Sequence, residues 1–148
     1  MKNIVLILAL ILVSCSSKDN DSNKNVEFTL IAQSQLHGNG NENIDQSNIV
    51  IKESSTWNNL ISQMNSVNNV SDDFEETDID FSIYQVIAVF DQIYTNGGHS
   101  IDIINITENG DNIIVKIDNL MTGDDTQVIT QPFHFVKMPK TEKQVIFE

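Results

Sequence analysis

The stretch Tyr84-Gln-Val-Ile-Ala-Val-Phe90 decides the fold of this 148-residue chain. It is almost continuously apolar, whereas a strand with one face in water alternates apolar and polar residues. We therefore expect the stretch to form a central strand of a β-sheet that is covered on both faces.

Further segments with the sequence pattern of strands surround this stretch. They are Val26–Ala32, Ile49–Ile51, Ser100–Thr107, Ile113–Asp118, Gln127–Met138 and Gln144–Phe147. Between two of them stands Asn109-Gly110, a dipeptide that is typical of tight hairpin turns. Pro132 cannot donate a backbone hydrogen bond, so its strand is expected at a sheet edge or a bulge, and an edge could accept a strand from a partner.

One amphipathic helix is expected at about residues 56–67. Its apolar side chains fall at i, i+3, i+4, i+7 and i+10 and form one stripe: Trp57, Leu60, Ile61, Met64 and Val67. Ser55 or Thr56 is expected to cap its N-terminus, and Asn68-Asn69 to end it. The predicted fold class is therefore α+β, mainly β, with six to seven mostly antiparallel strands and this helix packed on the sheet.

The first residues have the features of an export signal. The apolar run Ile4–Val13 is shorter than the about 20 residues that span a membrane, and it suits a signal peptide. It leads into Leu12-Val13-Ser14-Cys15, which resembles the lipobox of bacterial lipoproteins. The resemblance implies cleavage before Cys15 and attachment of a diacylglycerol and a further acyl chain, such as palmitate, to that cysteine. Membrane lipid would then be the anchor.

Three parts of the chain are predicted from these features. Residues 1–14 form the cleaved signal peptide, residues 15–25 the lipidated cysteine with a polar, flexible tether, and residues 26–148 a single globular domain. Cys15 is the only cysteine. No disulfide, thiol chemistry or cysteine zinc site is therefore expected in the domain.

The charge of the chain excludes some partners. Its eight basic residues are all lysine, and they face 21 acidic residues, which gives a formal net charge of −13. Nucleic-acid binding needs a basic surface that displaces counterions, so this class is set aside. An acidic domain is also repelled by anionic lipid, so the lipid on Cys15 would have to hold it at the membrane.

Several motifs in the C-terminal half resemble one family. Asp80-Phe81 precedes the apolar stretch, Asn96-Gly97-Gly98-His99-Ser100-Ile101 resembles a Gly-Gly-aromatic-Ser-Ile motif, and residues 130–139 resemble a closing strand. Over residues 80–147 the chain is similar to the PrcB family, lipoproteins named as subunits of a bacterial surface protease complex. The resemblance implies an accessory protein that docks, stabilises or modulates an exported protease.

The adjacent glycines of this motif mark the candidate site. Two glycines before an apolar strand indicate a backbone with positive φ or a close approach by another chain. The loop is then either a sharp turn within the fold or a binding loop on a rigid sheet. Its candidate partner-binding residues are Asn96, Gly97, Gly98, His99 and Ser100.

The sequence does not predict catalysis, a metal or a cofactor. Neighbours on a strand point to opposite faces, so His99 and Ser100 cannot act as base and nucleophile merely by adjacency. His37, His99 and His134 follow no ligand spacing. The acidic segment 72–80 offers oxygen ligands for calcium but not in the order of a calcium loop.

We therefore expect a non-catalytic lipoprotein of the cell envelope, anchored to the outer membrane, with exposure at the cell surface as one option. Its domain would bind another protein, for which an exported protease is one candidate. The alternative is an envelope lipoprotein that binds a small ligand or calcium. A large enclosed apolar cavity would favour the small ligand, whereas a filled core with an open sheet edge would favour protein binding.

Overall fold

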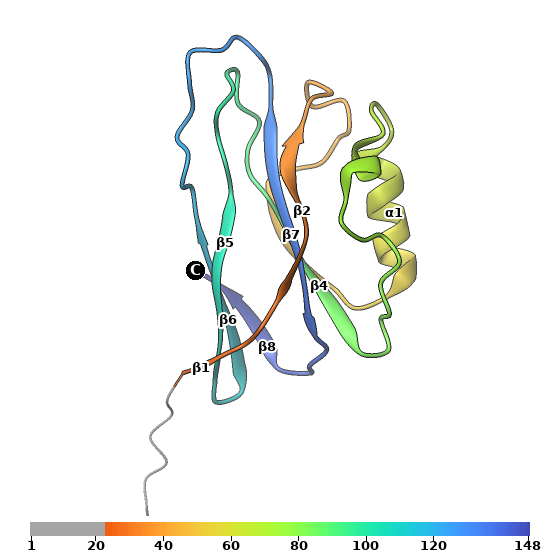
Figure 1. The fold of residues 1–148 in the computed structure, drawn as a ribbon, viewed down its shortest axis with the longest axis vertical. Coiled ribbons are helices and arrows are strands. Elements are labelled where there is room, and N and C mark those ends of the chain that lie inside the picture. The colour runs from red at the N-terminus through yellow and green to blue at the C-terminus, as the bar shows by residue number, and fades with distance from the viewer. Residues whose placement is uncertain (1–22) are drawn as a thin grey trace, which may run out of the picture.

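Two four-stranded sheets and one helix build the domain (Figure 1). The computed structural model describes residues 23–148, so the predicted signal peptide, lipobox and Cys15 lie outside the described residues. In order across the first sheet, the strands are β1 (Lys24–Asn25), β5 (Asp102–Asn109), β6 (Asn112–Asp118) and β8 (Gln144–Phe147). In the second sheet they are β2 (Thr29–Leu36), β7 (Gln131–Pro139), β4 (Tyr84–Phe90) and β3 (Ser47–Ile51).

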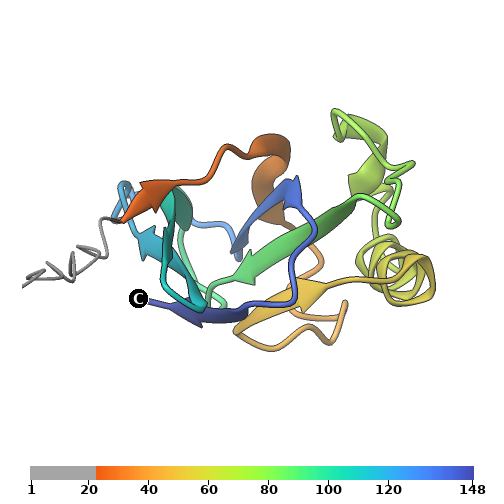
Figure 2. The same ribbon diagram turned by 90° about the horizontal axis from the view of Figure 1, so that it is seen from below.

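The second sheet is the middle layer of three, between the first sheet and helix α1 (Ser54–Met64), as Figure 2 shows. Strand β4 explains this arrangement, because its side chains alternate between two cores. Val86, Ala88 and Phe90 pack on the helix side. Ile87 and Val89 pack on the side of the first sheet. The prediction of a central strand covered on both faces is confirmed, as is the mainly β fold class with mostly antiparallel pairing.

Helix α1 covers the middle sheet through the predicted apolar stripe, but it is shorter than predicted. Trp57 is 1% exposed, its ring meets Phe135 edge to face at 5.9 Å, and its Nε1 donates to the Thr77 carbonyl at 2.8 Å. Val67 lies beyond the last residue of the helix, Met64, and is 45% exposed. The predicted extension to residue 67 is therefore wrong.

Both predicted ends of the helix also differ from the structure. The N-cap is Glu53, and no side chain of the described residues caps it, so a capping role for Ser55 or Thr56 is wrong. At the other end, Asn65 leaves the helix and its side chain exchanges hydrogen bonds of 2.7 and 3.0 Å with Ser71. Asparagine side chains readily bond nearby backbone in this way, which ends the helix before Asn68-Asn69.

The domain begins slightly earlier than predicted. Lys24 and Asn25, assigned to the flexible tether of residues 15–25, pair with β5 as strand β1. Further along, a register shift between Leu30 and Ala32 interrupts the regular pairing of β2 with β7. A bulge puts two successive residues on one partner residue, which is why Ile31 and Ala32 are both buried.

Pro132 lies in β7, which has β2 on one side and β4 on the other, so the predicted edge position is wrong. The Asp91 N–H donates to the Pro132 carbonyl at 2.9 Å. In a regular ladder the Pro132 N–H would return a bond to the Asp91 carbonyl. The side chain of Gln131 supplies that bond instead, with Nε2 at 2.9 Å from the Asp91 oxygen, so an interior strand tolerates the proline.

Candidate functional site

Residues 92–100 and residues 119–130 lie side by side at one end of the sandwich, and we call them the loop pair (Figure 1). Backbone bridges join Tyr94 to Thr130 and His99 to Thr122. The predicted site is therefore one half of a paired structure. Its other half is the connection between β6 and β7.

The two glycines of the predicted site allow this close pairing. Gly98 has φ +72°, and a Cβ there would lie 2.7 Å from the Asp124 carboxylate. A Cβ at Gly97 would overlap Thr126. From the opposite loop, Gly123 has φ +103° and a Cβ there would lie 2.5 Å from Nε2 of His99. The close approach that the glycines predicted occurs, and the approaching segment belongs to this same chain.

His99 is half-buried within the loop pair rather than extended into solvent. Its ring stacks on Tyr94 with centroids 3.6 Å apart and an angle of 7° between planes. Its Nε2 lies 3.1 Å from Oδ1 of Asn96. Hydrogen bonds from the Thr126 side chain and backbone lower the pKa of Asp124, and His99 adds to this effect. The predicted residues thus hold the loop pair in one conformation.

Ser100 is buried and its hydroxyl is fully engaged. The Oγ donates to Oδ2 of Asp102 at 2.5 Å and accepts the Met121 N–H at 3.0 Å. Asp102 also accepts Nε2 of Gln33 at 2.5 Å. A hydroxyl that donates to a carboxylate and receives a backbone amide has a positioning role in this network. It is not presented to a substrate.

Asp91, which follows β4, joins the loop pair to the rest of the domain. It is 5% exposed and accepts four bonds from neutral donors of 2.6 to 3.2 Å: Gln46 Nε2, the Gln92 N–H, the Tyr94 hydroxyl and Asn119 Nδ2. Burial, and then the bond to Asp91, raise the pKa of the Tyr94 phenol. A carboxylate with so many donors fixes the base of both loops.

The loop pair also exposes apolar side chains that the sequence reasoning missed. Among residues 23–148, nine large hydrophobic residues are exposed, and five of them lie here: Ile93, Leu120, Met121, Val128 and Ile129. We call this surface the loop face. The signal for it is the presence of two apolar pairs, 120–121 and 128–129, in a segment otherwise rich in Asp, Thr and Gly. The loop pair also carries two aspartates, Asp124 and Asp125, and no lysine, so its charged side chains are acidic.

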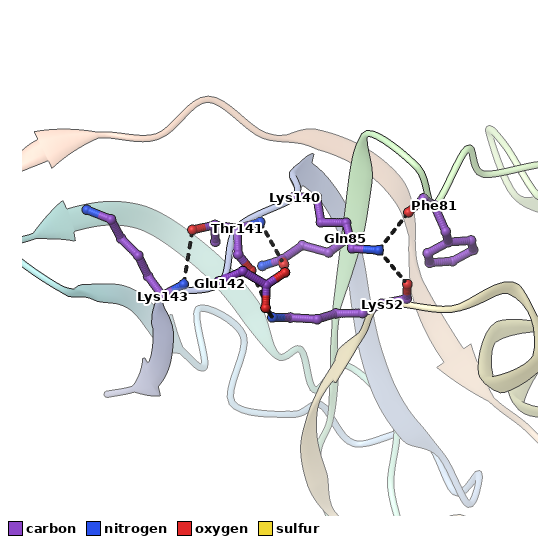
Figure 3. Close-up of polar contacts among 7 residues, drawn as sticks. All are labelled: Lys52, Phe81, Gln85, Lys140, Thr141, Glu142 and Lys143. Carbon is purple, nitrogen blue, oxygen red and sulfur yellow. Dashed lines mark hydrogen bonds and ion pairs between the residues drawn. The ribbon is translucent and has the colours of Figure 1, made fainter.

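The opposite end of the sandwich is held by lysines (Figure 3). Nζ of Lys140 donates to the carbonyls of Phe81 at 2.9 Å and Lys52 at 3.2 Å. Nζ of Lys52 donates to the Thr141 carbonyl at 2.8 Å and lies 3.6 Å from the Glu142 carboxylate. We call these two lysines the lysine clasp. Both ammonium groups bond to backbone carbonyls of their own chain, so the lysines have a structural role here.

Gln85 lies beneath this clasp and is completely buried. Its Oε1 accepts the Thr141 N–H at 3.2 Å, which ties the turn between β7 and β8 to the middle sheet. Its Nε2 finds no hydrogen-bond partner in the described part of the chain. Gln85 therefore accepts the Thr141 N–H although its own amide donor stays unpaired. We interpret Gln85 as a residue that positions the turn.

Neither the three histidines nor the acidic segment 72–80 forms a cluster of metal ligands in the described range. Within residues 23–148, no group of three or more His, Cys, Asp or Glu side chains could hold a metal ion. In the acidic segment 72–80, Glu76 forms an ion pair with Lys137. His134 is buried between the sheets, where its Nδ1 accepts the Ile103 N–H at 3.0 Å. Burial lowers the pKa of His134, and the charge of Asp102 partly opposes this.

The interior between the layers of the described domain is apolar, and clefts open at its surface. Two apolar clusters occupy the spaces between the three layers. The surface clefts have volumes of about 240 to 410 Å³. No helix in the described range is long and apolar enough to cross a membrane.

No protein-family model, curated protein or solved structure matches the chain. The resemblance to the PrcB family therefore stays a prediction, and the site has to be interpreted from its own geometry.

Proposed function

We propose that the chain is a lipid-anchored protein of the cell envelope whose domain binds another protein through the loop face. The observation that carries the proposal is that five of the nine exposed large hydrophobic side chains among residues 23–148 lie on the loop pair, whose two loops are joined by backbone bridges. Exposed apolar side chains that gather on one surface mark sites of protein interaction.

The rigidity of the loop pair supports a binding role. Positive φ at Gly98 and Gly123, the stack of His99 on Tyr94 and the bonds to Asp91 hold both loops in one conformation. A preorganised surface loses little conformational entropy when a partner binds. The loop face is thus suited to recognition by a fixed shape.

The charge of the loop face indicates the chemistry of the partner. Asp124 and Asp125 of the loop pair are exposed, as is Asp118 at the end of β6. A complementary surface would offer apolar anchors with Lys or Arg beside them, because opposite charges speed association and fix the register. The resemblance to the PrcB family suggests an exported protease as the partner, with this chain as a subunit that docks or stabilises it.

The membrane attachment can be tested at Cys15. Cys15→Ala removes the residue on which the lipid would be carried, so the protein should lose the lipid and move from the membrane fraction to the soluble fraction. Fractionation and mass spectrometry measure both outcomes. If the variant is still cleaved before residue 15 and recovered with membranes, the anchoring proposal is wrong.

The binding surface can be tested with a photoreactive side chain at Leu120, which is 65% exposed. In intact cells, illumination should give a discrete adduct with one partner. Ile83, 55% exposed next to the lysine clasp, is the matched control and should give no adduct of that size. Equal crosslinking at both positions, or none at Leu120, would contradict a role for the loop face.

A further inference from the structure

Strand β3 is a regular and uncovered edge of the middle sheet. It pairs with β4 over its five residues without a register shift, and it has no second neighbour among the described strands. The other edge, β2, is interrupted by its bulge and is covered where the Glu75 N–H donates to the Ile31 carbonyl at 2.9 Å. Bulges and coverage are the usual protection of an edge, and β3 lacks both.

The pairing of β4 shows which groups of β3 are free. The Asp91 N–H donates to Pro132, and the Ile83 carbonyl accepts the Lys140 N–H, so the odd-numbered residues around β4 face β7. The even-numbered residues of β4 therefore face β3, opposite Ser47, Ile49 and Ile51. The N–H and C=O groups of Asn48 and Val50 consequently point away from the sheet, toward the open edge.

Strand β8 borders the same opening from the first sheet. The Glu148 N–H donates to Val115 and the Glu148 carbonyl accepts from Ile117, so even-numbered residues of this strand face β6. Val145 and Phe147 then carry the outward backbone groups. Like β3, strand β8 has one neighbour among the described strands. Two free strand edges thus flank the opening between the sheets.

A groove of about 370 Å³ lies between these edges at the end near the loop pair, and we call it the seam groove. Ser47 and Asn48 line it from β3, and Phe147 and Glu148 from β8. At the other end the lysine clasp ties the residue after β3 to the turn before β8 (Figure 3). The opening is therefore closed at one end and accessible at the other.

The lining of the seam groove is apolar inside and acidic at its sides. Ile101, Ile117 and Phe147 contribute apolar surface, and Asp91 and Glu148 contribute carboxylates. Asp91 accepts only neutral donors, so its charge is not balanced by a lysine within the described domain. The groove therefore favours a ligand with apolar side chains and positive charge.

We propose that the seam groove binds an extended segment of a partner protein, which adds to β3 as a further strand. Its backbone would bond to Asn48 and Val50, alternate apolar side chains would enter the groove, and a Lys or Arg would lie beside Asp91 and Glu148. A second copy of this chain is disfavoured as the occupant, because two chains of formal charge −13 repel each other. The groove lining includes none of the five side chains of the loop face, so either proposal can fail alone.

The test uses a short synthetic peptide of alternating valine and threonine with a lysine at each end, and a twin with glutamates in those places. The lysine peptide should bind to the full domain at least about tenfold more tightly than the twin. It should also protect the Asn48 and Val50 amides from hydrogen exchange. Methylation of alternate peptide nitrogens should abolish binding, since it removes the donors that pair with β3.

Asn48→Pro is the matching change in the protein. The Asn48 N–H points outward, so proline should leave the pairing of β3 with β4 intact while blocking strand addition. Binding of the lysine peptide should weaken at least about tenfold, whereas Val67→Ala, at an exposed position outside the groove, should bind as the wild type does. The proposal is overturned if the lysine peptide does not bind at about 1 mM, if N-methylation has no effect, or if the wild type dimerises through this edge.

Discussion

The two ends of the sandwich are held by charged groups of opposite sign. At one end, Lys52 and Lys140 donate to backbone carbonyls. At the other, the buried carboxylates of Asp91 and Asp102 accept bonds from amides and hydroxyls. Both arrangements fasten turns to the sheets. Five of the nine exposed large hydrophobic residues among residues 23–148 lie at the carboxylate end. The same kind of fastening thus closes one end of the sandwich and holds an exposed apolar surface at the other.

The largest effect is expected at Asp91, the centre of the carboxylate end. Asp91→Ala removes four acceptor bonds and leaves the donors of Gln46, Tyr94 and Asn119 unpaired. Because a bond to a charged group contributes about 1.5–3 kcal/mol, the free energy of unfolding should fall by about 3 kcal/mol or more. Chemical denaturation measures it. Asp91→Asn keeps one acceptor oxygen, so its free energy of unfolding should lie between those of the wild type and Asp91→Ala. An unchanged unfolding midpoint for Asp91→Ala would mean that this residue does not fasten the carboxylate end.

Gly98→Ala tests whether the conformation of the loop pair is strained against side chains. Gly98 has φ +72° and faces Asp124 at contact distance, so alanine should destabilise the domain by about 1–2 kcal/mol. Thermal or chemical unfolding measures the change. Adding Asp124→Ala should recover only the part that comes from the contact. A Gly98→Ala variant as stable as the wild type would mean that the loop has room to rearrange.

The central strand and the hairpin were predictable because local pattern and tertiary role agree there. Val86–Phe90 is apolar and buried at every position, with Gln85 as the one buried polar residue of the strand, and Asn109-Gly110 marks the turn where Gly110 has φ +56° and Asn109 pairs with Asn112. The edge position predicted for Pro132 was wrong because the group that replaces its missing N–H donates to a residue far away in the sequence. The bond from the side chain of Gln131 to Asp91 replaces the missing donor only once both strands are in place.

The candidate site was predictable only in part, for a related reason. The glycines at 97 and 98 indicate a close approach of another segment, but they do not identify that segment. The segment that does so, residues 119–130, has neither the alternation of a strand nor the stripe of a helix. The role of Asp91 also has no local sequence pattern, because the donors of its four bonds lie between one and 45 positions away in the chain.

A smaller effect is expected at the lysine clasp. Lys140→Met removes the two bonds to the carbonyls of Phe81 and Lys52 but keeps a long apolar side chain. Since the clasp is partly in solvent, the loss should be about 1 kcal/mol or less. Lys116→Met, at an exposed position on β6, is the control and should not change the unfolding midpoint. A loss as large as that of Asp91→Ala would make the two ends equivalent in energy.

The smallest effect concerns pH and His134, the neutral side chain near the carboxylate end. Burial lowers the pKa of His134 below its usual 6.5, so between that value and its folded pKa the unfolded chain binds more protons than the folded one. The stabilisation by neutral His134 is therefore complete above about pH 6.5 and is lost as the pH falls through the folded pKa. His134→Asn keeps an acceptor for the Ile103 N–H but cannot take up a proton, so its free energy of unfolding should depend less on pH between about 5 and 7. Denaturation curves across this range measure the slope. Equal slopes for wild type and His134→Asn would mean that the charge of Asp102 offsets the burial of the imidazole completely. The folded domain would then hold a protonated His134 without loss of stability.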